Sequence, residues 1–570
     1  MRTLTFFDPA CGCGNFLVIT YRELRLLELE VLRAANAGGQ MALDVHQMIA
    51  VDVDQFFGIE IEDFPAQIAQ VALWLVDHQM NMKVSEEFGA YFVRIPLNHS
   101  ATIVHANALR LDWGAVLPPE KCAYLLGNPP FVGHQWRSAE QMADMASVWG
   151  DGGRFGRLDF VTCWHHKAVQ YMKHNPKVVT ALVSTNSICQ GEQVGTLWSW
   201  MLEHGVKIHF AHRTFMWTSE ARGRAAVHCV IVGFSLEDAD EKVIFEYEDI
   251  KGEPHAIKAR NINPYLVDAE NIILPSRTAT PAGLPQLIKG SQPTDGGHLI
   301  LSEQEAEALQ AEEPTAAKWL KTYIGGEELI NGGRRYCLWL KGISPKELKS
   351  MPAVMKRVAA VSQARLKSPT KSVQAFADKP TLFTQDRQPD KDYLGVPEVS
   401  SERRRFIPIA FLSADIIASN KVQIVEGATQ YHFGMLCSTM HNAWVRTVAG
   451  RLKSDYSYSP AVYNNFPWPT PTDKQRAAIE AAAQAVLDAR AAHPDSSLAD
   501  LYDPLTMPPD LVKAHQKLDA AVDASYGYKG GSTDAARVAF LFGLYQQITS
   551  LLPADCGKTR RARRVNAEAV

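Results

Sequence analysis

The sequence predicts an α/β protein whose N-terminal part is built on a mostly parallel β-sheet, followed by a mixed α+β region and a C-terminal helical region. Through about residue 235, apolar runs alternate with helical patterns, which is typical of βαβ units. The apolar runs are continuous rather than alternating, as expected for strands that helices cover on both faces. From about 236 to 465, short strands mix with Pro, Gly and polar turns, and Ala-rich helices follow.

The individual elements are predicted in chain order. Apolar runs predict strands at 4–7, 56–61, 123–126, 178–184, 206–211, 227–234 and 242–247. Helical patterns predict helices at 16–35, 65–80, 159–172, 473–492, 510–526 and 533–552. Pro65 stands near the start of its helix, where the missing N–H costs nothing, and Gly527 is expected to cap the helix before it. The Pro- and aromatic-rich stretch 464–471 is a predicted connector, and the basic tail 556–570 is predicted to be disordered.

Composition excludes several classes of protein. The chain has 570 residues, of which 46% are hydrophobic and 21% charged, so it can build several globular cores. No apolar run reaches the length of about eighteen residues that a membrane-spanning helix needs. The nine cysteines are scattered without a CxxC pair, so we predict no metal site and expect free thiols in a reducing cytoplasm. The net charge of −4 gives no overall affinity for nucleic acid but leaves a local basic face open.

The first motif runs from Asp8 to Leu17 (DPACGCGNFL), directly after a predicted strand and at the start of a predicted helix. Its glycines let the backbone turn sharply and approach a ligand closely. A dinucleotide-binding fingerprint needs a third glycine, and Leu17 occupies that position, so no pyrophosphate is expected. An aspartate at the strand end repels phosphate but can hold a cation. The motif therefore favours S-adenosylmethionine, which carries sulfonium and ammonium groups.

Two later strand ends also supply polar side chains. Glu60, in the run GIEIE, can accept both hydroxyls of a ribose, and the alternative is an exposed acid at the end of a strand. Asn107, in the run HANAL, can both donate and accept hydrogen bonds, which suits the edge of an adenine. A simple polar turn explains Asn107 equally well.

The fourth motif, NPPF, comprises Asn128, Pro129, Pro130 and Phe131 and follows an apolar strand. The prolines hold Asn128 extended, so that its side-chain carbonyl and the Pro129 main-chain carbonyl can point at one amino group. Two acceptors on the hydrogens of that group favour a pyramidal nitrogen whose lone pair faces a methyl donor. Phe131 can stack on a flipped base. This geometry admits adenine N6 and cytosine N4, and the alternative is a Pro-rich turn with a buried Phe.

The motifs DPACGCGNF and NPPF resemble those of class I amino-methyltransferases that act on adenine N6 of DNA, in the order of their gamma arrangement. Longer stretches, among them GIEIEDFPAQIAQVALWLVDHQMN, RLDFVTCWHHKA and YNNFPWP, resemble the type IIL, MmeI-like restriction–modification proteins. The resemblance runs from Phe7 to about Leu552. It implies a Rossmann-like class I methyltransferase domain at 1–240, a connecting segment at 241–284, a target-recognition domain at 285–465 and a helical region at 466–555.

The resemblance also implies roles for individual residues. The cofactor S-adenosylmethionine would be bound by Asp8, Ala10, Gly12, Gly14, Glu60 and Asn107. Asn128, Pro129, Pro130 and Phe131 would form the catalytic pocket, with His228 as a second wall for the base. The alternative for His228 is a histidine of the protein core. Contacts with DNA would come from Arg334, Arg335, Arg446, Arg451, Lys453 and Tyr456, because such a domain must bind phosphates and read base edges.

The function implied by the resemblance is site-specific, S-adenosylmethionine-dependent methylation of adenine N6 in duplex DNA, within a restriction–modification or phage-defence system. Two departures stand out. Cys13 replaces a serine of the family, and the chain begins at the Gly-rich loop, without the family's N-terminal nuclease and helices. Three interpretations are open: a split gene with a separately encoded nuclease and helical subunit, a truncated open reading frame, or a separate modification subunit. One alternative is a catalytically impaired DNA-recognition fragment of a split protein. The other is an amino-methyltransferase that acts on RNA or on protein.

Overall fold

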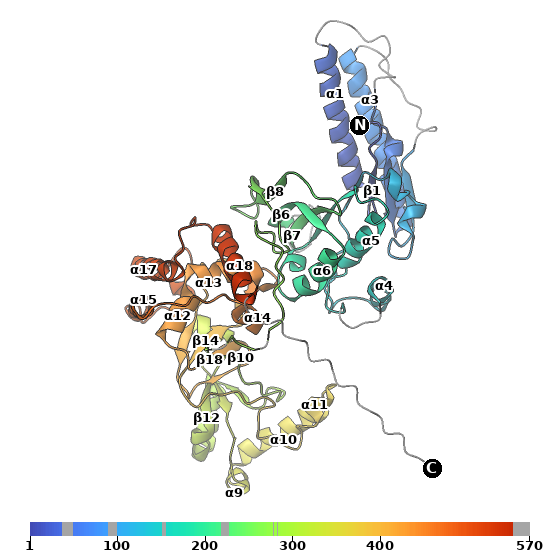
Figure 1. Cartoon of the computed structure of the whole chain (residues 1–570). Helices are drawn as coiled ribbons and strands as arrows, with labels where there is room; N and C mark the ends of the chain where they lie inside the picture. Colours follow the sequence, from blue (N-terminus) through green and yellow to red (C-terminus); the bar gives the residue numbers. More distant parts are fainter. Residues whose placement is uncertain are drawn as a thin grey trace, which may run out of the picture.

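The computed structural model describes residues 1–36, 49–88, 100–150, 155–217, 227–277, 279–281 and 283–550. It confirms the predicted fold class: an N-terminal α/β domain, a mixed region and a C-terminal helical region follow one another along the chain (Figure 1). The predicted basic tail lies outside the described residues. Among the helices that are described, none combines the length and the apolar character needed to cross a membrane.

A nine-stranded sheet in the order β3-β2-β1-β4-β5-β7-β6-β8-β9 forms the N-terminal domain. Its strands are β1 (Phe6–Asp8), β2 (Phe56–Glu60), β3 (Thr102–His105), β4 (Tyr124–Gly127), β5 (Val179–Thr185), β6 (Lys207–Trp217), β7 (Val227–Ser235), β8 (Lys242–Glu246) and β9 (His255–Ala259). The first five strands in space, β3 to β5, pair in parallel, and β7 is the antiparallel neighbour of both β5 and β6. The carboxyl ends of β1, β2, β3 and β4 therefore meet at one edge of the sheet.

Five helices belong to this domain: α1 (Asn15–Asn36), α3 (Asp63–Phe88), α4 (Ala139–Trp149), α5 (Thr162–Met172) and α6 (Glu192–Glu203), of which α4 packs on α5. The sequence predicted α1, α3 and α5 but neither α4 nor α6. Ser138 caps α4 by accepting from the N–H of Gln141. The predicted start of α5 at Asp159 is three residues too early, because Asp159 accepts hydrogen bonds from backbone N–H groups instead of entering the helix.

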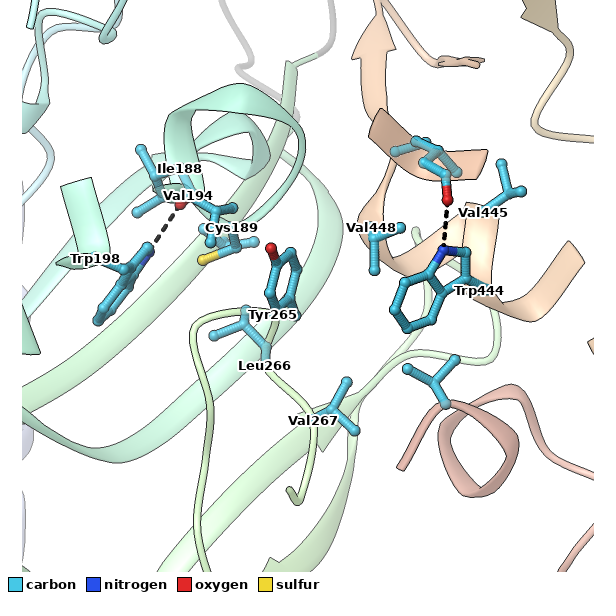
Figure 2. Close-up of a cluster of buried hydrophobic side chains, with 14 of the residues drawn as sticks. Ile188, Cys189, Val194, Trp198, Tyr265, Leu266, Val267, Trp444, Val445 and Val448 are labelled. Atoms are coloured by element: carbon cyan, nitrogen blue, oxygen red, sulfur yellow. Dashed lines mark hydrogen bonds between the residues drawn. The ribbon is translucent and has the colours of Figure 1, made fainter. Parts of the chain in front are cut away.

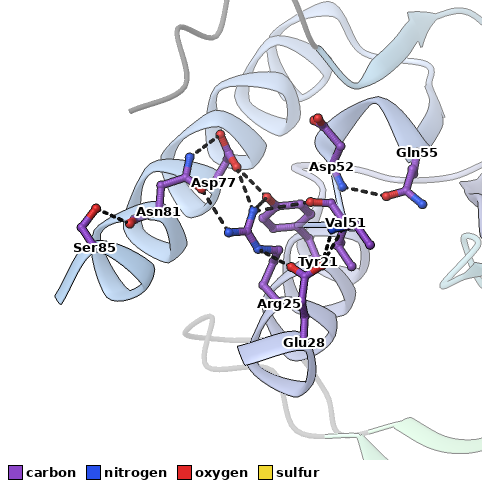
Figure 3. A network of polar contacts seen from close by, with 10 residues as sticks. Tyr21, Arg25, Glu28, Val51, Asp52, Gln55, Asp77, Asn81 and Ser85 are labelled. Atoms are coloured by element: carbon purple, nitrogen blue, oxygen red, sulfur yellow. Dashed lines mark hydrogen bonds and ion pairs between the residues drawn. The ribbon is translucent and has the colours of Figure 1, made fainter. Parts of the chain in front are cut away.

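The long helices α1 and α3 lie side by side and share a buried polar network (Figures 1 and 3). At its centre the Arg25 side chain is fully buried, and its Nη2 donates to Oδ1 of Asn81 at 3.1 Å. The guanidinium also lies 3.2 Å from a carboxylate oxygen of Glu28 and 3.6 Å from one of Asp77. Glu28 in turn accepts from the N–H of Val51 at 3.1 Å. The two buried carboxylates therefore share one cation, and the contacts of Arg25 with Asn81 and Asp77 link α1 to α3.

The mixed region contains two four-stranded sheets and one three-stranded sheet. Its strands are β10 (Leu287–Lys289), β11 (Ile300–Ser302), β12 (Leu320–Ile324), β13 (Arg335–Leu338), β14 (Tyr393–Pro397), β15 (Val399–Ser400), β16 (Ala410–Leu412), β17 (Ile417–Ala418), β18 (Val422–Glu426), β19 (Gly450–Leu452) and β20 (Asp455–Ser457). Its helices are α7 (Glu303–Glu312), α8 (Gly326–Asn331), α9 (Pro345–Lys349), α10 (Pro352–Leu366), α11 (Lys371–Gln374), α12 (Gln430–Cys437), α13 (Thr439–Val448) and α14 (Pro460–Asn464).

The C-terminal region holds α15 (Asp473–Ala491), α16 (Leu498–Leu501), α17 (Pro509–Tyr526) and α18 (Asp534–Ser550). As predicted, Gly527 ends α17 in a left-handed conformation with a φ of 62°. Helix α12 packs on α15 and α13 packs on α18, so two helices that precede the predicted connector belong to the same helical body. No local pattern in the sequence separates them from the surrounding strands.

A continuous hydrophobic core joins the N-terminal domain to the helical body (Figure 2). Trp198 of α6 and Trp444 of α13 are fully buried on its two sides. The segment 265–267 lies between them, with the buried side chains of Tyr265, Leu266 and Val267. Each indole N–H is satisfied, by the carbonyl of Ile188 for Trp198 and by that of Val462 for Trp444. The two parts of the chain are therefore held together by buried apolar surface.

The network of Figure 3 predicts a strong dependence of stability on Arg25. Arg25→Met leaves Glu28 and Asp77 buried without a cation, so we expect a loss of about 3 kcal/mol or more in the free energy of unfolding. Urea denaturation of the parent and the variant measures this loss in the free energy of unfolding. The control is Arg22→Met on the same helix, because Arg22 pairs with Glu23 in an exposed ion pair and should cost less than about 1 kcal/mol. Equal losses in the two variants would contradict the assigned role of the network.

Candidate active site

A cavity of about 460 Å³ opens at the edge of the sheet where the parallel strands end. Five of the predicted site residues line it together: Ala10, Glu60, Asn107, Asn128 and Pro130. They lie at the ends of β1, β2, β3 and β4 or shortly after them, so parallel pairing brings together motifs that stand far apart in the sequence. The remaining wall is formed by Pro9, Ile59, Ile61, Ala106, Ala108, Leu109, Ser138, Glu140, Gln141, Asp144, Phe160 and Trp164.

The Gly-rich loop is held in place from two sides. Glu60 accepts from the N–H of Gly12 at 2.9 Å through Oε2, and from that of Glu62 at 3.0 Å through Oε1. The indole N–H of Trp164 donates to the carbonyl of Pro9 at 3.0 Å. Gly12 has a φ of 55°, a left-handed conformation that favours glycine. Each carboxylate oxygen of Glu60 keeps a free lone pair for a hydroxyl group in the cavity.

Gly14 and Gly127 are needed for close packing. A Cβ at Gly14 would lie 3.0 Å from the Cβ of Ala69 on α3, and Gly14 is not part of the cavity wall. A Cβ at Gly127 would lie 2.5 Å from Oδ1 of Asp8. Gly14 therefore lets α1 start against α3, whereas Gly127 makes room for a buried carboxylate.

The carboxylate of Asp8 lies behind the cavity wall and is 1% exposed. Its Oδ1 accepts from the N–H of Ala10 at 3.0 Å, whereas its buried Oδ2 has no hydrogen-bond partner within the described chain. Burial, which outweighs this hydrogen bond, and the negative charge of Glu60 raise the pKa of Asp8 to about 7. An unsatisfied buried carboxylate next to a second carboxylate favours positive charge nearby.

The NPPF motif presents an unsatisfied acceptor. Oδ1 of Asn128 is buried and has no hydrogen-bond partner among the described residues. The loop that follows is fixed by Asp159, whose Oδ1 accepts from the N–H of Val132 at 3.0 Å. The N–H of Phe160 donates to the carbonyl of Val132 at 3.1 Å. Burial raises the pKa of the Asp159 carboxyl, although backbone hydrogen bonds oppose this shift.

The other residues of the motif have different surroundings. Pro129 is buried, Pro130 lines the cavity, and Phe131 is half-buried against the hydrophobic core. Phe131 is not among the residues that line the cavity, so it stands beside the cofactor-sized space and not in its wall. The sequence did not predict the role of Asp159, because its partner Val132 lies 27 residues away.

Helix α4 covers the cavity and is tied down by a buried aspartate. Oδ2 of Asp144 accepts from Nδ2 of Asn107 at 3.0 Å, and Oδ1 accepts from Nε of Arg110 at 2.7 Å. Oδ1 of Asn107 accepts from the N–H of Leu109 at 2.9 Å. The predicted side chain of Asn107 therefore reaches the cavity, but its polar groups already hold α4 and its own loop.

The structure places His228 and Arg451 together, away from this cavity. Nε2 of His228 lies 3.6 Å from a carboxylate oxygen of Glu402, and neither His228 nor Arg451 lines the cavity. Nη1 of Arg451 lies 3.0 Å from the same Glu402 oxygen, and Nε of Arg451 donates to Gln190 at 3.3 Å. The guanidinium of Arg451 also lies 4.2 Å from the ring centroid of Tyr456, which is buried. This cluster joins β7 and the loop before α6 to β19 and β20.

The remaining residues predicted to contact DNA fall into two groups. Arg446 forms an ion pair with Asp534 at 2.6 Å and donates to the carbonyl of Arg405 at 2.7 Å. Arg335 is paired with Glu328 at 2.6 Å. Lys453 is exposed, and so is Arg334, which lies 4.0 Å from a carboxylate oxygen of Glu303 on the surface. The geometry therefore favours a structural role for Arg446, whereas the side chains of Lys453 and Arg334 are accessible from solvent. Within the described residues, no group of three or more His, Cys, Asp or Glu side chains can hold a metal ion.

Comparison with known proteins finds matches along nearly the whole chain. Three family models match, described as the DNA-methyltransferase, target recognition and C-terminal domains of MmeI, at residues 1–246, 268–470 and 471–553. DNA methyltransferase A of Bacillus subtilis (strain 168) is 39% identical over 552 residues, which cover 96% of this chain and 61% of that relative. The chain thus spans about three fifths of the length of this curated relative.

A solved structure supports the same assignment. It is described as the type IIL restriction-modification enzyme MmeI in complex with DNA and is 55% identical to this chain. The match has a TM-score of 0.86 and covers 96% of this chain and 74% of that chain. The similarity therefore extends through all three regions of the fold.

Asp8 predicts an unusual pH dependence of stability. Burial raises the pKa of its carboxyl from 3.8 to about 7, so between these values the folded chain keeps a proton that the unfolded chain has lost. The contribution of Asp8 to the free energy of unfolding therefore falls as the pH rises through this window. Asp8→Asn cannot titrate, so its stability relative to the parent should increase from pH 5 to pH 7 and then level off.

Melting temperatures of the two proteins across this pH range measure the effect. The control is Asp415→Asn, because the exposed Asp415 pairs with Lys321, which lowers its pKa. The difference in melting temperature between Asp415→Asn and the parent should stay constant above pH 5. A constant difference for Asp8→Asn as well would show that Asp8 is ionised throughout and would contradict the assigned environment.

Proposed function

The chain belongs to the MmeI family of type IIL restriction–modification proteins, and from this premise we propose that it methylates adenine N6 at a specific site in duplex DNA. The proposed methyl donor is S-adenosylmethionine. The observation that carries the proposal is the unsatisfied Oδ1 of Asn128, which stands at the cavity beside the Gly-rich loop. Matches to a DNA-methyltransferase domain and to a target recognition domain support it.

The residues at the cavity fit the proposed cofactor. A volume of about 460 Å³ lies within the range of small-molecule sites. Apolar side chains, among them Ile59 and Phe160, offer surfaces for a purine ring, and the free lone pairs of Glu60 suit ribose hydroxyls. The orphaned Oδ2 of Asp8 suits the positive charge of a sulfonium compound. When bound, S-adenosylmethionine supplies an electrophilic methyl group.

Asn128 and Pro129 act on the amino group that receives the methyl. Their carbonyl oxygens would accept hydrogen bonds from its two N–H groups and so direct the lone pair of N6 away from the ring and toward the donor. The bound donor would supply the methyl group to this nitrogen, and the surplus proton on the methylated N6 would leave to water. An acceptor that is already in place and unsatisfied costs no rearrangement in the transition state.

Two features of the proposal rest on the family and not on the pocket. Two carbonyl acceptors fit the amino group of cytosine as well as that of adenine, and the resemblance of the chain to adenine-N6 enzymes favours adenine. We also propose the domain boundaries 1–240, 241–284, 285–465 and 466–555, with duplex DNA bound by the target-recognition domain.

Methyl transfer to DNA tests the proposed function directly. Purified protein is incubated with radiolabelled S-adenosylmethionine and mixed-sequence duplex DNA, the DNA is digested, and the nucleosides are separated by mass. We expect N6-methyladenine. N4-methylcytosine would overturn the choice of base. The absence of any labelled nucleoside would favour the alternative of an impaired DNA-recognition fragment.

Asn128→Ala should separate catalysis from DNA binding. The variant loses the acceptor for the target amino group, so we expect methyl transfer to fall by about 100-fold or more. Binding of duplex DNA should stay near that of the parent, because the change leaves the target-recognition domain intact. The control is Asn331→Ala at the exposed end of α8, which should leave both quantities unchanged. An unchanged rate of methyl transfer in Asn128→Ala would contradict the proposed role of Asn128 as an acceptor for the target amino group.

A further inference from the structure

Trp136 is the most exposed aromatic side chain among the described residues, with 84% of its surface in contact with solvent. It stands on the loop 131–137, between the NPPF motif and α4. The residues that flank this loop, Pro130 and Ser138, both line the cavity of the candidate active site. Two residues of chain span at most about 7 Å, so the backbone of Trp136 lies within that distance of the cavity wall at Ser138.

The loop that carries Trp136 is anchored at several points. The N–H of Trp136 donates to the carbonyl of Gly133 at 2.9 Å, which closes a turn. On one side the N–H of Val132 donates to Asp159, and on the other the guanidinium of Arg137 donates to the carbonyl of Gly156. An indole is therefore presented to solvent by a loop that is fixed on both sides. Single exposed apolar residues are common, but this tryptophan stands on a fixed loop whose two flanking residues line the cavity, a position from which it can meet a substrate.

We propose that Trp136 stacks against the bases of duplex DNA next to the target adenine and fills part of the space that the flipped base leaves. This inference rests on the proposed function, because it takes duplex DNA as the substrate. A base must leave the helix to reach Asn128, and this costs the stacking and pairing of that base. Apolar side chains that enter a base step offset such a cost, and aromatic rings are suited to stacking on bases of any sequence.

The position of Trp136 fits this role better than that of Phe131. Phe131 is half-buried against the core beside the catalytic residues, where a base that has already left the helix would arrive. Trp136 is exposed on the loop that joins Pro130 to Ser138 of the same site, and we place the duplex against this loop. The two aromatic residues therefore have separate roles, since Phe131 contacts the extruded base and Trp136 contacts the stack that remains. A rigid loop loses little conformational freedom when it binds.

The test compares Trp136→Ala, Trp136→Phe and Leu505→Ala with the parent. Leu505 is the matched control, because it is also 84% exposed on a turn but lies in the C-terminal region. The methylated adenine is first located by sequencing DNA that the parent has modified. Two duplexes with this site are then prepared, one with thymine and one with an abasic nucleotide opposite the target adenine.

On the paired duplex we expect kcat/KM of Trp136→Ala to fall by about tenfold or more, within the about 5- to 150-fold range of stacking on one aromatic side chain. Trp136→Phe should retain most of the activity, and Leu505→Ala all of it. On the abasic duplex the target adenine is already unpaired, so kcat/KM of Trp136→Ala should approach that of the parent. With 2-aminopurine in place of the target adenine, fluorescence at saturating protein should be lower for Trp136→Ala than for the parent.

Two results would overturn the inference while leaving the proposed function intact. One is parent-like kcat/KM of Trp136→Ala on the paired duplex. The other is an equal loss on the paired and abasic duplexes with unchanged 2-aminopurine fluorescence, which would indicate a structural defect. If the parent itself transfers no methyl group, the proposed function fails separately. In that case the affinity for mixed-sequence duplex DNA tests the inference about Trp136. We expect Trp136→Ala to bind this DNA about tenfold more weakly than Leu505→Ala, and equal affinities of the two variants would reject the inference.

Discussion

The buried carboxylate at the end of β1 is the constraint on which the site depends. Asp8 pairs in register with Gly58 of β2 and lies against Gly127 of β4. A side chain at Gly127 would displace the carboxylate, and one at Gly58 would meet the thiol of Cys11 at 2.8 Å. The carboxyl of Asp8 and the thiol of Cys11 can therefore pack against the neighbouring strands only because these strands carry glycine at both positions. This packing supports the Gly-rich loop beside Glu60 and Asn128, and it leaves a carboxyl oxygen without a hydrogen-bond partner behind the cavity wall.

Much of the fold and of the site follows from local sequence signals. The apolar runs located β2, β4, β5 and β7 within one or two residues, and the motifs identified Ala10, Glu60, Asn107 and Asn128 as neighbours of one cavity. The reason is that a strand, its tight turn and the polar residue after it form one short stretch of chain. Parallel pairing of the strands then brings these stretches to the same edge of the sheet, so no long-range contact has to be predicted to place them together.

Other residues could not be assigned in this way, because their partners are distant in the sequence. Asp144 and Asp159 hold α4 and the catalytic loop through contacts 27 to 37 residues away. Arg446 carries the charge expected of a phosphate contact, but it pairs with Asp534, 88 residues further on. Gly14 belongs to a motif that binds ligands, yet its hydrogen faces Ala69 of α3. The type of a residue indicates which interactions it can make, but tertiary packing determines which partner it contacts.

The central claim is that the unsatisfied oxygen of Asn128 receives the amino group of an extruded adenine. A crystal structure of the chain with a non-reactive analogue of the methyl donor and a duplex bearing its site tests this claim most directly. We expect the target adenine outside the helix, with N6 within about 2.7–3.2 Å of both Oδ1 of Asn128 and the carbonyl oxygen of Pro129. An adenine that remains stacked in the duplex, or an amino group that points away from Asn128, would contradict this claim.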